Sequence, residues 1–207
     1  MSRYLSLDTE ATGLTESDLL IQLAVVPLDV ETKTVHVNLG METLVQCPSF
    51  ESMKPKLNSW VIEHNEKLIT EAHQKGVPAL KLRELMTEYL DSAEIKSFFR
   101  NERPILLGKS MSALDIPLLT RTFGWEFMNQ RFHHQVVDVT SVARFLVDAG
   151  HLPKGCESTS KIVKYFGIRE NALHTALSDA MDMAHIYIKM VEAHKKDSSY
   201  LSSDKTK

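Results

Sequence analysis

Short apolar runs alternate with polar segments in the first half of the chain, and longer helical patterns fill the second half. Strand-like runs occupy Tyr4–Leu7, Leu20–Leu28, Thr34–Leu39 and Ile105–Leu107. Short apolar stretches of this kind, bounded by turn residues, are typical of buried strands. This order of elements predicts an α/β fold in which helices flank a mixed sheet.

Helical spacing of apolar residues predicts three long helices, over Leu57–Gln74, Leu80–Phe99 and Ala172–Met190. Pro78 precedes the second of these and suits the opening of a helix. A shorter helix is expected between a cap at Ser158-Thr159-Ser160 and Gly167, whose missing Cβ suits a left-handed C-terminal cap.

The chain has 207 residues, of which 43% are hydrophobic, and this is enough for one domain with a sizeable core. We expect that domain to span residues 1–193. The tail, residues 194–207, is rich in Lys, Ser and Asp and is predicted to be disordered. No apolar run is long enough for a signal peptide or a membrane span, which predicts a cytoplasmic protein. Cys47 and Cys156 lack the CxxC spacing of zinc or redox sites.

An acidic pair, Asp8 and Glu10, ends the first predicted strand. Residues two apart on a strand point to the same face, so both carboxylates can serve one site, where hard oxygen ligands suit Mg²⁺ or Mn²⁺. A calcium loop of the EF-hand type is a competing interpretation, but its position for the bidentate Glu falls on Leu19. The plainer alternative is a strand-end pair that faces water.

Two further places carry candidate chemistry. His174 lies five residues before Asp179, and on a helix the two side chains would stand roughly 140° apart. We therefore expect His174 in the loop ahead of the helix and Asp179 on the helix itself. For His174 alone, a loop or cap histidine is the plainer alternative. Asp115 opens a predicted helix, where it can also be an N-cap.

The order of these motifs resembles a known superfamily. Asp8-x-Glu10 with Thr12-Gly13-Leu14, a central Asp115, and His174-x-Ala176-x-x-Asp179 together resemble the DEDD exonucleases, in the histidine-bearing subtype, DEDDh. The resemblance implies a ribonuclease H-like fold and two metal ions, Mg²⁺ or Mn²⁺, per site. It also implies that Asp8 bridges the ions, that Glu10 and Asp179 complete the site of the attacking water, that Asp115 serves the second ion, and that His174 is the general base.

Shorter segments resemble the oligoribonuclease branch of that superfamily. Phe132-His133 stands five residues before Asp138 as it does there, and Trp60 to His64 resembles a stretch of the branch. Two features depart from the pattern: His134 stands where the branch has a catalytic tyrosine, and Gly108 to Asp115 is one residue longer than usual. A homodimer is suggested only by this likeness.

Candidate substrate contacts come from the same comparison and from the side-chain types. The Thr12-Gly13-Leu14 turn offers backbone N–H groups, and Leu14 resembles an apolar wedge beside the terminal base, with ordinary core packing as its alternative. Trp60 and His64 are candidates for stacking on bases, and Phe132 is a weaker one that we expect in the core. Basic residues can form a rim near His174, although a solvated helix face is favoured for them; they are Lys154, Lys161, Lys164 and Arg169.

The sequence therefore predicts a metal-dependent 3′–5′ exonuclease that releases nucleoside 5′-monophosphates from single strands. With 24 basic and 27 acidic residues the formal net charge is −3, which suits short oligonucleotides, with RNA as the expected type, better than long polyanions. A DNA exonuclease with a proofreading or repair role is one alternative, because only contacts to the 2′-OH separate the two substrates. A non-catalytic nucleic-acid-binding protein of the same fold is another.

Overall fold

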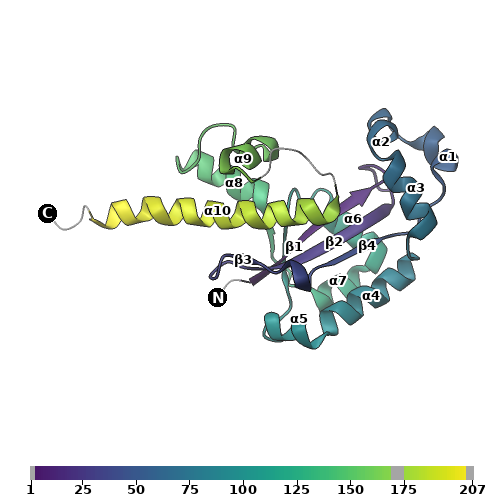
Figure 1. Ribbon diagram of the computed structural model, residues 1–207, viewed down its shortest axis with the longest axis horizontal. Helices are drawn as coiled ribbons and strands as arrows, with labels where there is room; N and C mark the ends of the chain where they lie inside the picture. Colours follow the sequence, from purple (N-terminus) through teal and green to yellow (C-terminus); the bar gives the residue numbers. More distant parts are fainter. Residues whose placement is uncertain (1–2, 169–174, 204–207) are drawn as a thin grey trace.

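The computed structural model describes the backbone of residues 3–168 and 175–203, with side chains as far as Lys195. Within this part, the strands form one mixed sheet in the order β3 (Thr34–Val35), β2 (Leu20–Asp29), β1 (Arg3–Ala11), β5 (Ile105–Gly108) and β6 (Val136–Asp138), with β4 (Met41–Leu44) also on β2. β1 is antiparallel to β2 and parallel to β5. The predicted mixed sheet flanked by helices is confirmed (Figure 1).

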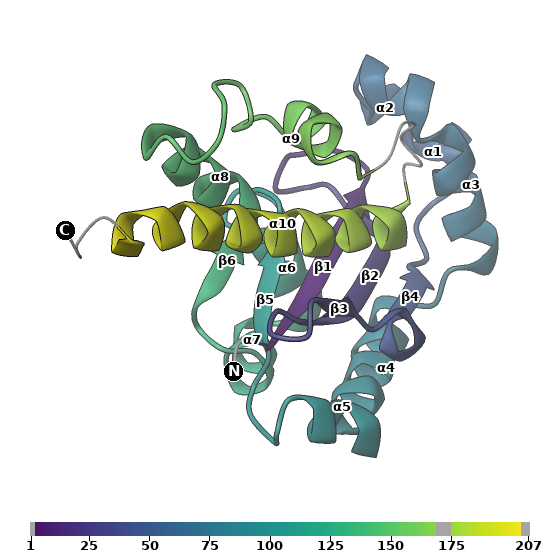
Figure 2. The same cartoon turned by 60° about the vertical axis from the view of Figure 1, so that its left-hand side comes forward.

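Helices cover both faces of this sheet (Figures 1 and 2). One face packs against α4 (Ala79–Asp91), α5 (Ala93–Phe98), α6 (Asp115–Phe123) and α7 (Trp125–Arg131). The other face packs against α8 (Val139–Asp148), α9 (Thr159–Phe166) and α10 (Ala176–Ser203). A smaller group lies at the outer end of β2 and comprises α1 (Phe50–Met53), the 3₁₀ turn η2 (Lys54–Lys56), α2 (Ser59–His64) and α3 (Glu66–Lys75).

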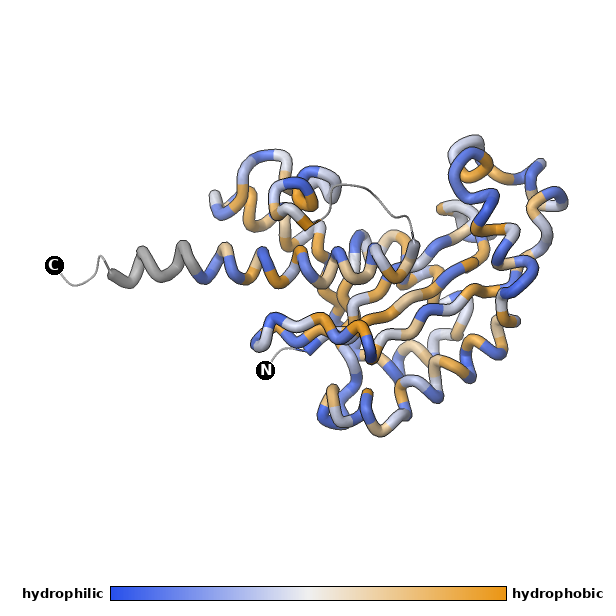
Figure 3. Tube along the Cα trace, in the orientation of Figure 1, coloured by the Kyte–Doolittle hydropathy of each residue, from blue (hydrophilic) through white to orange (hydrophobic). Residues whose placement is uncertain are grey.

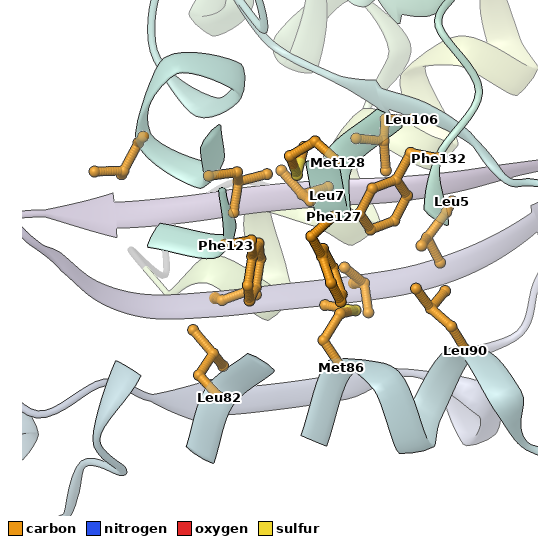
Figure 4. Packing of buried hydrophobic residues seen from close by; sticks show 14 of the residues in the cluster. Leu5, Leu7, Leu82, Met86, Leu90, Leu106, Phe123, Phe127, Met128 and Phe132 are labelled. Carbon is orange, nitrogen blue, oxygen red and sulfur yellow. The ribbon is translucent and has the colours of Figure 1, made fainter. Parts of the chain in front are cut away.

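Alternation along β1 supplies side chains to both cores. Leu5 and Leu7 point to the first face, where Figure 4 shows them among residues of α4, α6 and α7, including Met86 and Phe123. Each fully buried side chain of this size stabilises the fold by roughly 1.5–3 kcal/mol relative to exposure. β2 is buried along its whole length, and Figure 3 shows long hydrophobic stretches in the central strands of the sheet. The helices therefore hold β1 from two sides.

The strand predictions hold for the interior of the sheet and fail at its edge. β2 and β5 match their predicted runs, and β1 extends further than expected, through Asp8 and Glu10 to Ala11. The single strand predicted over Thr34–Leu39 is wrong. The chain leaves the extended conformation at His36, where φ is −91° and ψ is 72°, directly after the short β3. It then forms a 3₁₀ turn, η1 (Val37–Leu39), and returns to extended backbone at Gly40, just before β4.

Each of the first two predicted helices is broken once. The helix expected over Leu57–Gln74 is interrupted at Asn65, where φ is −110° and ψ is 3°, and so becomes α2 and α3. The helix over Leu80–Phe99 is interrupted at Ser92, whose hydroxyl caps α5 by accepting from the Ile95 N–H. Only Ser92 uses its side chain to start the new helix, because the Asn65 side chain makes no cap hydrogen bond and donates instead to the Ala11 carbonyl of β1. Gly167 ends α9 in the left-handed conformation, as predicted.

The last helix is longer than its predicted apolar stretch. α10 begins at Ala176 and continues to Ser203, well into the segment whose composition predicts a disordered tail. Between Ala176 and Ser203 the sequence has neither Gly nor Pro, so nothing local stops the helix. In the described part of the chain, no helix combines the length and the apolar character that crossing a membrane requires.

Gly108, at the end of β5, provides a test of the sheet. A Cβ placed there would lie 2.7 Å from the Leu7 carbonyl oxygen and closer still to the Met111 sulfur, so β5 approaches β1 too closely for a side chain. We expect Gly108→Ala to lower the free energy of unfolding by roughly 2–3 kcal/mol, measured by urea denaturation. Gly40→Ala, whose Cβ would find its nearest atoms at 3.1 Å, is the control and should cost less. Equal effects would contradict this account.

Candidate active site

One face of β1 carries a row of polar side chains. Asp8 and Glu10 point to this face together with Ser6, while Thr9, between them, points to the opposite one. Because Asp8 and Glu10 belong to the paired β1–β2 ladder, they lie in a regular strand. A strand in this position is incompatible with the loop of an EF-hand, so the calcium interpretation is excluded.

α10 brings a third carboxylate to the same place. Asp179 lies in the first turn of the helix, and its N–H donates to the Thr175 carbonyl at 3.0 Å. Asp8, Glu10 and Asp179 each have a carboxylate oxygen within 4.8 Å of the others. Three oxygen ligands at this spacing fit a divalent hard cation such as Mg²⁺ or Mn²⁺. We call Asp8, Glu10 and Asp179 the carboxylate cluster.

Asp115 reaches the cluster from the other side of β1. It lies in the first turn of α6, is only 4% exposed, and accepts a hydrogen bond of 2.5 Å from the Thr9 hydroxyl. Thr9 lies between Asp8 and Glu10 on β1, so this bond holds Asp115 against the same stretch of strand, and the charge of Asp115 raises the pKa of both Asp8 and Glu10. The N-cap position of α6 is occupied by Leu114, so the simple cap role considered for Asp115 is not the one it has.

Without a bound cation, burial and mutual repulsion make it unfavourable for all the carboxylates of this site to be ionised. Burial, with the charges of Asp115, Asp179 and Glu10, raises the pKa of Asp8 well above its usual range. Burial, together with Asp179 and Asp115, raises the pKa of Glu10 to about 7. Burial also raises the pKa of Asp115 to about 6, against the opposing hydrogen bond from Thr9. A bound divalent cation would offset this repulsion, and so the donor set fits such a metal.

Sequence reasoning assigned no role to Lys109, which follows β5 directly. Continuing the parallel register from Ser6 with Leu107 brings Lys109 level with Asp8. Its charge lowers the pKa of Asp8, Glu10 and Asp115, so the ammonium group lies within electrostatic reach of all three. The side chain is exposed. Sequence reasoning missed Lys109 because its position depends on the parallel pairing of β1 with β5, and these two strands are far apart in the sequence.

The turn after β1 is organised by a residue that the motif did not include. The Asp18 carboxylate accepts hydrogen bonds from the Thr12 hydroxyl at 2.9 Å and the Thr15 N–H at 2.7 Å. A Cβ on Gly13 would lie 2.6 Å from this carboxylate, so a larger residue there would displace the Asp18 side chain and disturb these hydrogen bonds. Leu14 is 79% exposed, which rules out its alternative role in the core.

Trp60 and His64 form an exposed stack on α2. Their ring centroids are 4.6 Å apart with planes 12° apart, and the His64 Nδ1 lies 2.8 Å from the Trp60 carbonyl oxygen. Asn65, at the junction of α2 and α3, donates to the Ala11 carbonyl at 3.4 Å and so ties this stack to the end of β1. Two of the predicted substrate contacts are therefore brought together on the surface.

The remaining predicted residues have varied positions. Phe132 is 3% exposed and belongs to the core, as expected. Asp138 caps α8, accepting from the Thr140 and Ser141 N–H groups, and also accepts from the Met111 N–H in the lengthened middle motif. His174 and Arg169 lie outside the described residues. The other basic residues considered as a rim are exposed; they are Lys154, Lys161 and Lys164.

Comparison with known proteins identifies the fold. No family model matches the chain, and no curated protein sequence matches it. Among solved structures, cell-death related nuclease 4 (CRN-4) is similar with a TM-score of 0.68 and 14% identity, covering 92% of this chain and 64% of that one. E. coli exonuclease I in complex with a dT13 oligonucleotide has a TM-score of 0.66 and 15% identity, with 97% and 43% covered.

The nuclease domain of 3′hExo, a DEDDh family member bound to rAMP, is similar over 92% of both chains, with a TM-score of 0.62 and 12% identity. The fold is that of these nucleases. The predicted ribonuclease H-like architecture is thereby confirmed. The chain spans 64% of the length of CRN-4 and 43% of that of exonuclease I.

The raised pKa values predict how the metal-free protein responds to pH. Glu10 has an ordinary value of 4.5 and a folded value of about 7, so between these the folded state binds more protons than the unfolded state. The free energy of unfolding should therefore fall as pH rises through this window, by on the order of 2 kcal/mol. Urea denaturation in EDTA would measure it. A free energy of unfolding that does not change with pH, or that does not increase when Mn²⁺ is added at pH 7, would contradict the assignment of the carboxylate cluster as a cation site.

Removing one carboxylate should have opposite effects with and without metal. In EDTA at neutral pH, Asp8→Asn relieves repulsion, and we expect the melting temperature to rise by roughly 2–4 °C for each kcal/mol gained. With Mn²⁺ present, the same variant should lose the metal-induced rise seen in wild type. Asp148→Asn, which changes an exposed carboxylate of α8, is the matched control and should behave as wild type. A metal response retained by Asp8→Asn would refute the ligand assignment.

Proposed function

We propose that this chain is a divalent-metal-dependent 3′–5′ exonuclease that acts on single-stranded nucleic acid, with short RNA as its substrate. The observation that carries the proposal is the carboxylate cluster, in which β1 and the first turn of α10 bring Asp8, Glu10 and Asp179 within 4.8 Å of one another. The fold shared with the exonucleases supports it. Nucleoside 5′-monophosphates are the products.

Asp8, Glu10, Asp179 and Asp115 would hold the metal. Two bound cations would supply an activated water and stabilise the leaving oxygen of the phosphodiester. Within this arrangement Asp8 occupies the centre, because its pKa responds to all three other carboxylates. Asp115, restrained by Thr9 on the far side of β1, would hold the second cation.

We assign the general base to His174. In the sequence it precedes Ala176, the first residue of α10, by two positions, and Asp179 lies in the opening turn of that helix. A histidine has an unperturbed pKa near 6.5 and so accepts a proton from an attacking water at neutral pH. Hydrolysis of the phosphodiester needs an acceptor for the proton of the attacking water, and His174, two residues before the start of α10, would fill that role.

Surface groups around the cluster suit a nucleotide. Lys109 is an exposed cation whose charge reaches Asp8, and it would contact a substrate phosphate. Leu14, at 79% exposed, is available to lie against the terminal base, and the Trp60–His64 stack offers a second aromatic surface. Base stacking of this kind tolerates any sequence. The substrate would therefore be held by its end and by its bases.

Charge favours a short substrate. A chain with a net charge of −3 offers few phosphate contacts beyond the site, and long polyanions need many of them. A DNA exonuclease is the second candidate, and one fold neighbour, E. coli exonuclease I, is bound to a dT13 oligonucleotide. The two candidates share every residue of the cluster, so only substrate comparison separates them.

The proposal is tested with 5′-labelled RNA and DNA of matched sequence, roughly two to twenty nucleotides long, incubated with purified protein and Mn²⁺. We expect stepwise shortening from the 3′ end, faster on RNA, with mononucleotides identified by mass spectrometry. EDTA and Asp179→Asn should abolish it, and His174→Ala should slow turnover by about 10²–10⁴-fold.

Asp148→Asn, at the last residue of α8, is the control for nonspecific loss of activity and should match wild type. Faster cleavage of DNA would replace the RNA assignment with the second candidate. Binding of oligonucleotides without cleavage, in the presence of bound Mn²⁺, would overturn the enzymatic proposal and leave a nucleic-acid-binding protein.

A further inference from the structure

Gln22 lies near the start of β2, directly opposite Glu10 in the antiparallel register. Cross-strand partners point to the same face of a sheet, so the Gln22 side chain lies beside the carboxylate cluster and beneath α10. It is only 7% exposed. A buried primary amide requires partners for both its oxygen and its nitrogen.

The Gln22 amide has a hydrogen-bond partner for its oxygen and another for its nitrogen. The Gln22 Oε1 accepts a hydrogen bond of 3.2 Å from the N–H of Ala176, the first residue of α10. The Gln22 Nε2 donates at 2.9 Å to the carboxylate of Glu42 on β4. An N–H can only donate and a carboxylate can only accept, so the amide has one orientation that satisfies both.

The contact with Ala176 matters because of where it lies. The first N–H groups of a helix have no acceptor within the helix, and Ala176 is completely buried, so leaving its N–H unpaired would be costly. Gln22 supplies that acceptor from the sheet. One turn further along α10, the buried Ser6 hydroxyl donates at 2.7 Å to the Ala180 carbonyl. Asp179 lies between these two attachments, so its backbone is fastened to the sheet on both sides.

We propose that Gln22 is a positioning residue, which places Asp179 over Asp8 and Glu10 by fixing the start of α10 and so sets the metal affinity of the site. This rests on the proposed function only in taking the cluster as a metal site. Glutamine suits the task better than glutamate, because a carboxylate could not donate to Glu42.

The test measures Mn²⁺ affinity by calorimetry, with the hydrogen exchange rate of the first turn of α10 as a second readout. Gln22→Met removes the acceptor at similar volume, and we expect Mn²⁺ to bind about 10- to 100-fold more weakly and the Ala176 amide to exchange faster. Gln130→Met is the matched control, since Gln130 also donates to a glutamate at 2.9 Å, within helix α7 on the other face of the sheet. It should leave both readouts unchanged.

A charge exchange supplies a rescue. Gln22→Glu alone places two carboxylates together and should weaken Mn²⁺ binding. Combining Gln22→Glu with Glu42→Gln puts an amide on β4 that can donate to the introduced carboxylate on β2, which still accepts from the Ala176 N–H. This double variant should recover affinity to within roughly threefold of wild type, and it keeps the inference testable if Gln22→Met fails to fold.

The outcomes separate this inference from the proposed function. Wild-type affinity in Gln22→Met, or a double variant no better than Gln22→Glu, would overturn the positioning role whatever the nuclease assay shows. Wild type that binds Mn²⁺, with the predicted losses and rescue, but cleaves nothing would overturn the exonuclease proposal alone. Wild type that binds no Mn²⁺ would overturn both.

Discussion

Repulsion between the half-buried carboxylates of Asp8, Glu10 and Asp179 is the interaction that the rest of the structure must offset. Asp8 and Glu10 cannot move apart, because both belong to one strand in a paired ladder, and Asp179 is held by a helix packed over that strand. The hydrophobic cores on the two sides of β1 stabilise an arrangement that its own charges oppose. Folding thereby creates a site of high negative potential, which is the property that selects a divalent cation.

Position within the sheet explains why four carboxylates converge without belonging to one element. Asp8 and Glu10 share a face of β1, while Thr9, between them, points to the other face and holds Asp115 at the start of α6. The end of β1 is therefore approached from both layers of helices. Lys109 directly follows β5, which pairs in parallel with β1, and it is the one cation among the described groups that perturb the pKa of Asp8.

The sequence predicted the parts of this site that are local. Period-two alternation placed Asp8 and Glu10 on one face, and helical spacing placed Asp179 on a helix, because both patterns follow from backbone geometry within a few residues. The contacts that complete the site are not local. Thr9 meets Asp115 across 106 positions, and Gln22 meets Ala176 across 154. The breaks at Asn65 and Ser92 were missed because apolar periodicity continues through both.

The alternation of β1 also limits how this strand can vary. Its two faces serve different purposes, since one carries Ser6, Asp8 and Glu10 and the other carries Leu5, Leu7 and Thr9. Deleting or inserting one residue near its start would exchange the faces, turning leucines toward α10 and carboxylates into the core. A substitution in β1 affects one side chain, whereas an insertion or deletion moves every side chain of the strand to the wrong face. The number of residues in this strand is therefore more constrained than their identity.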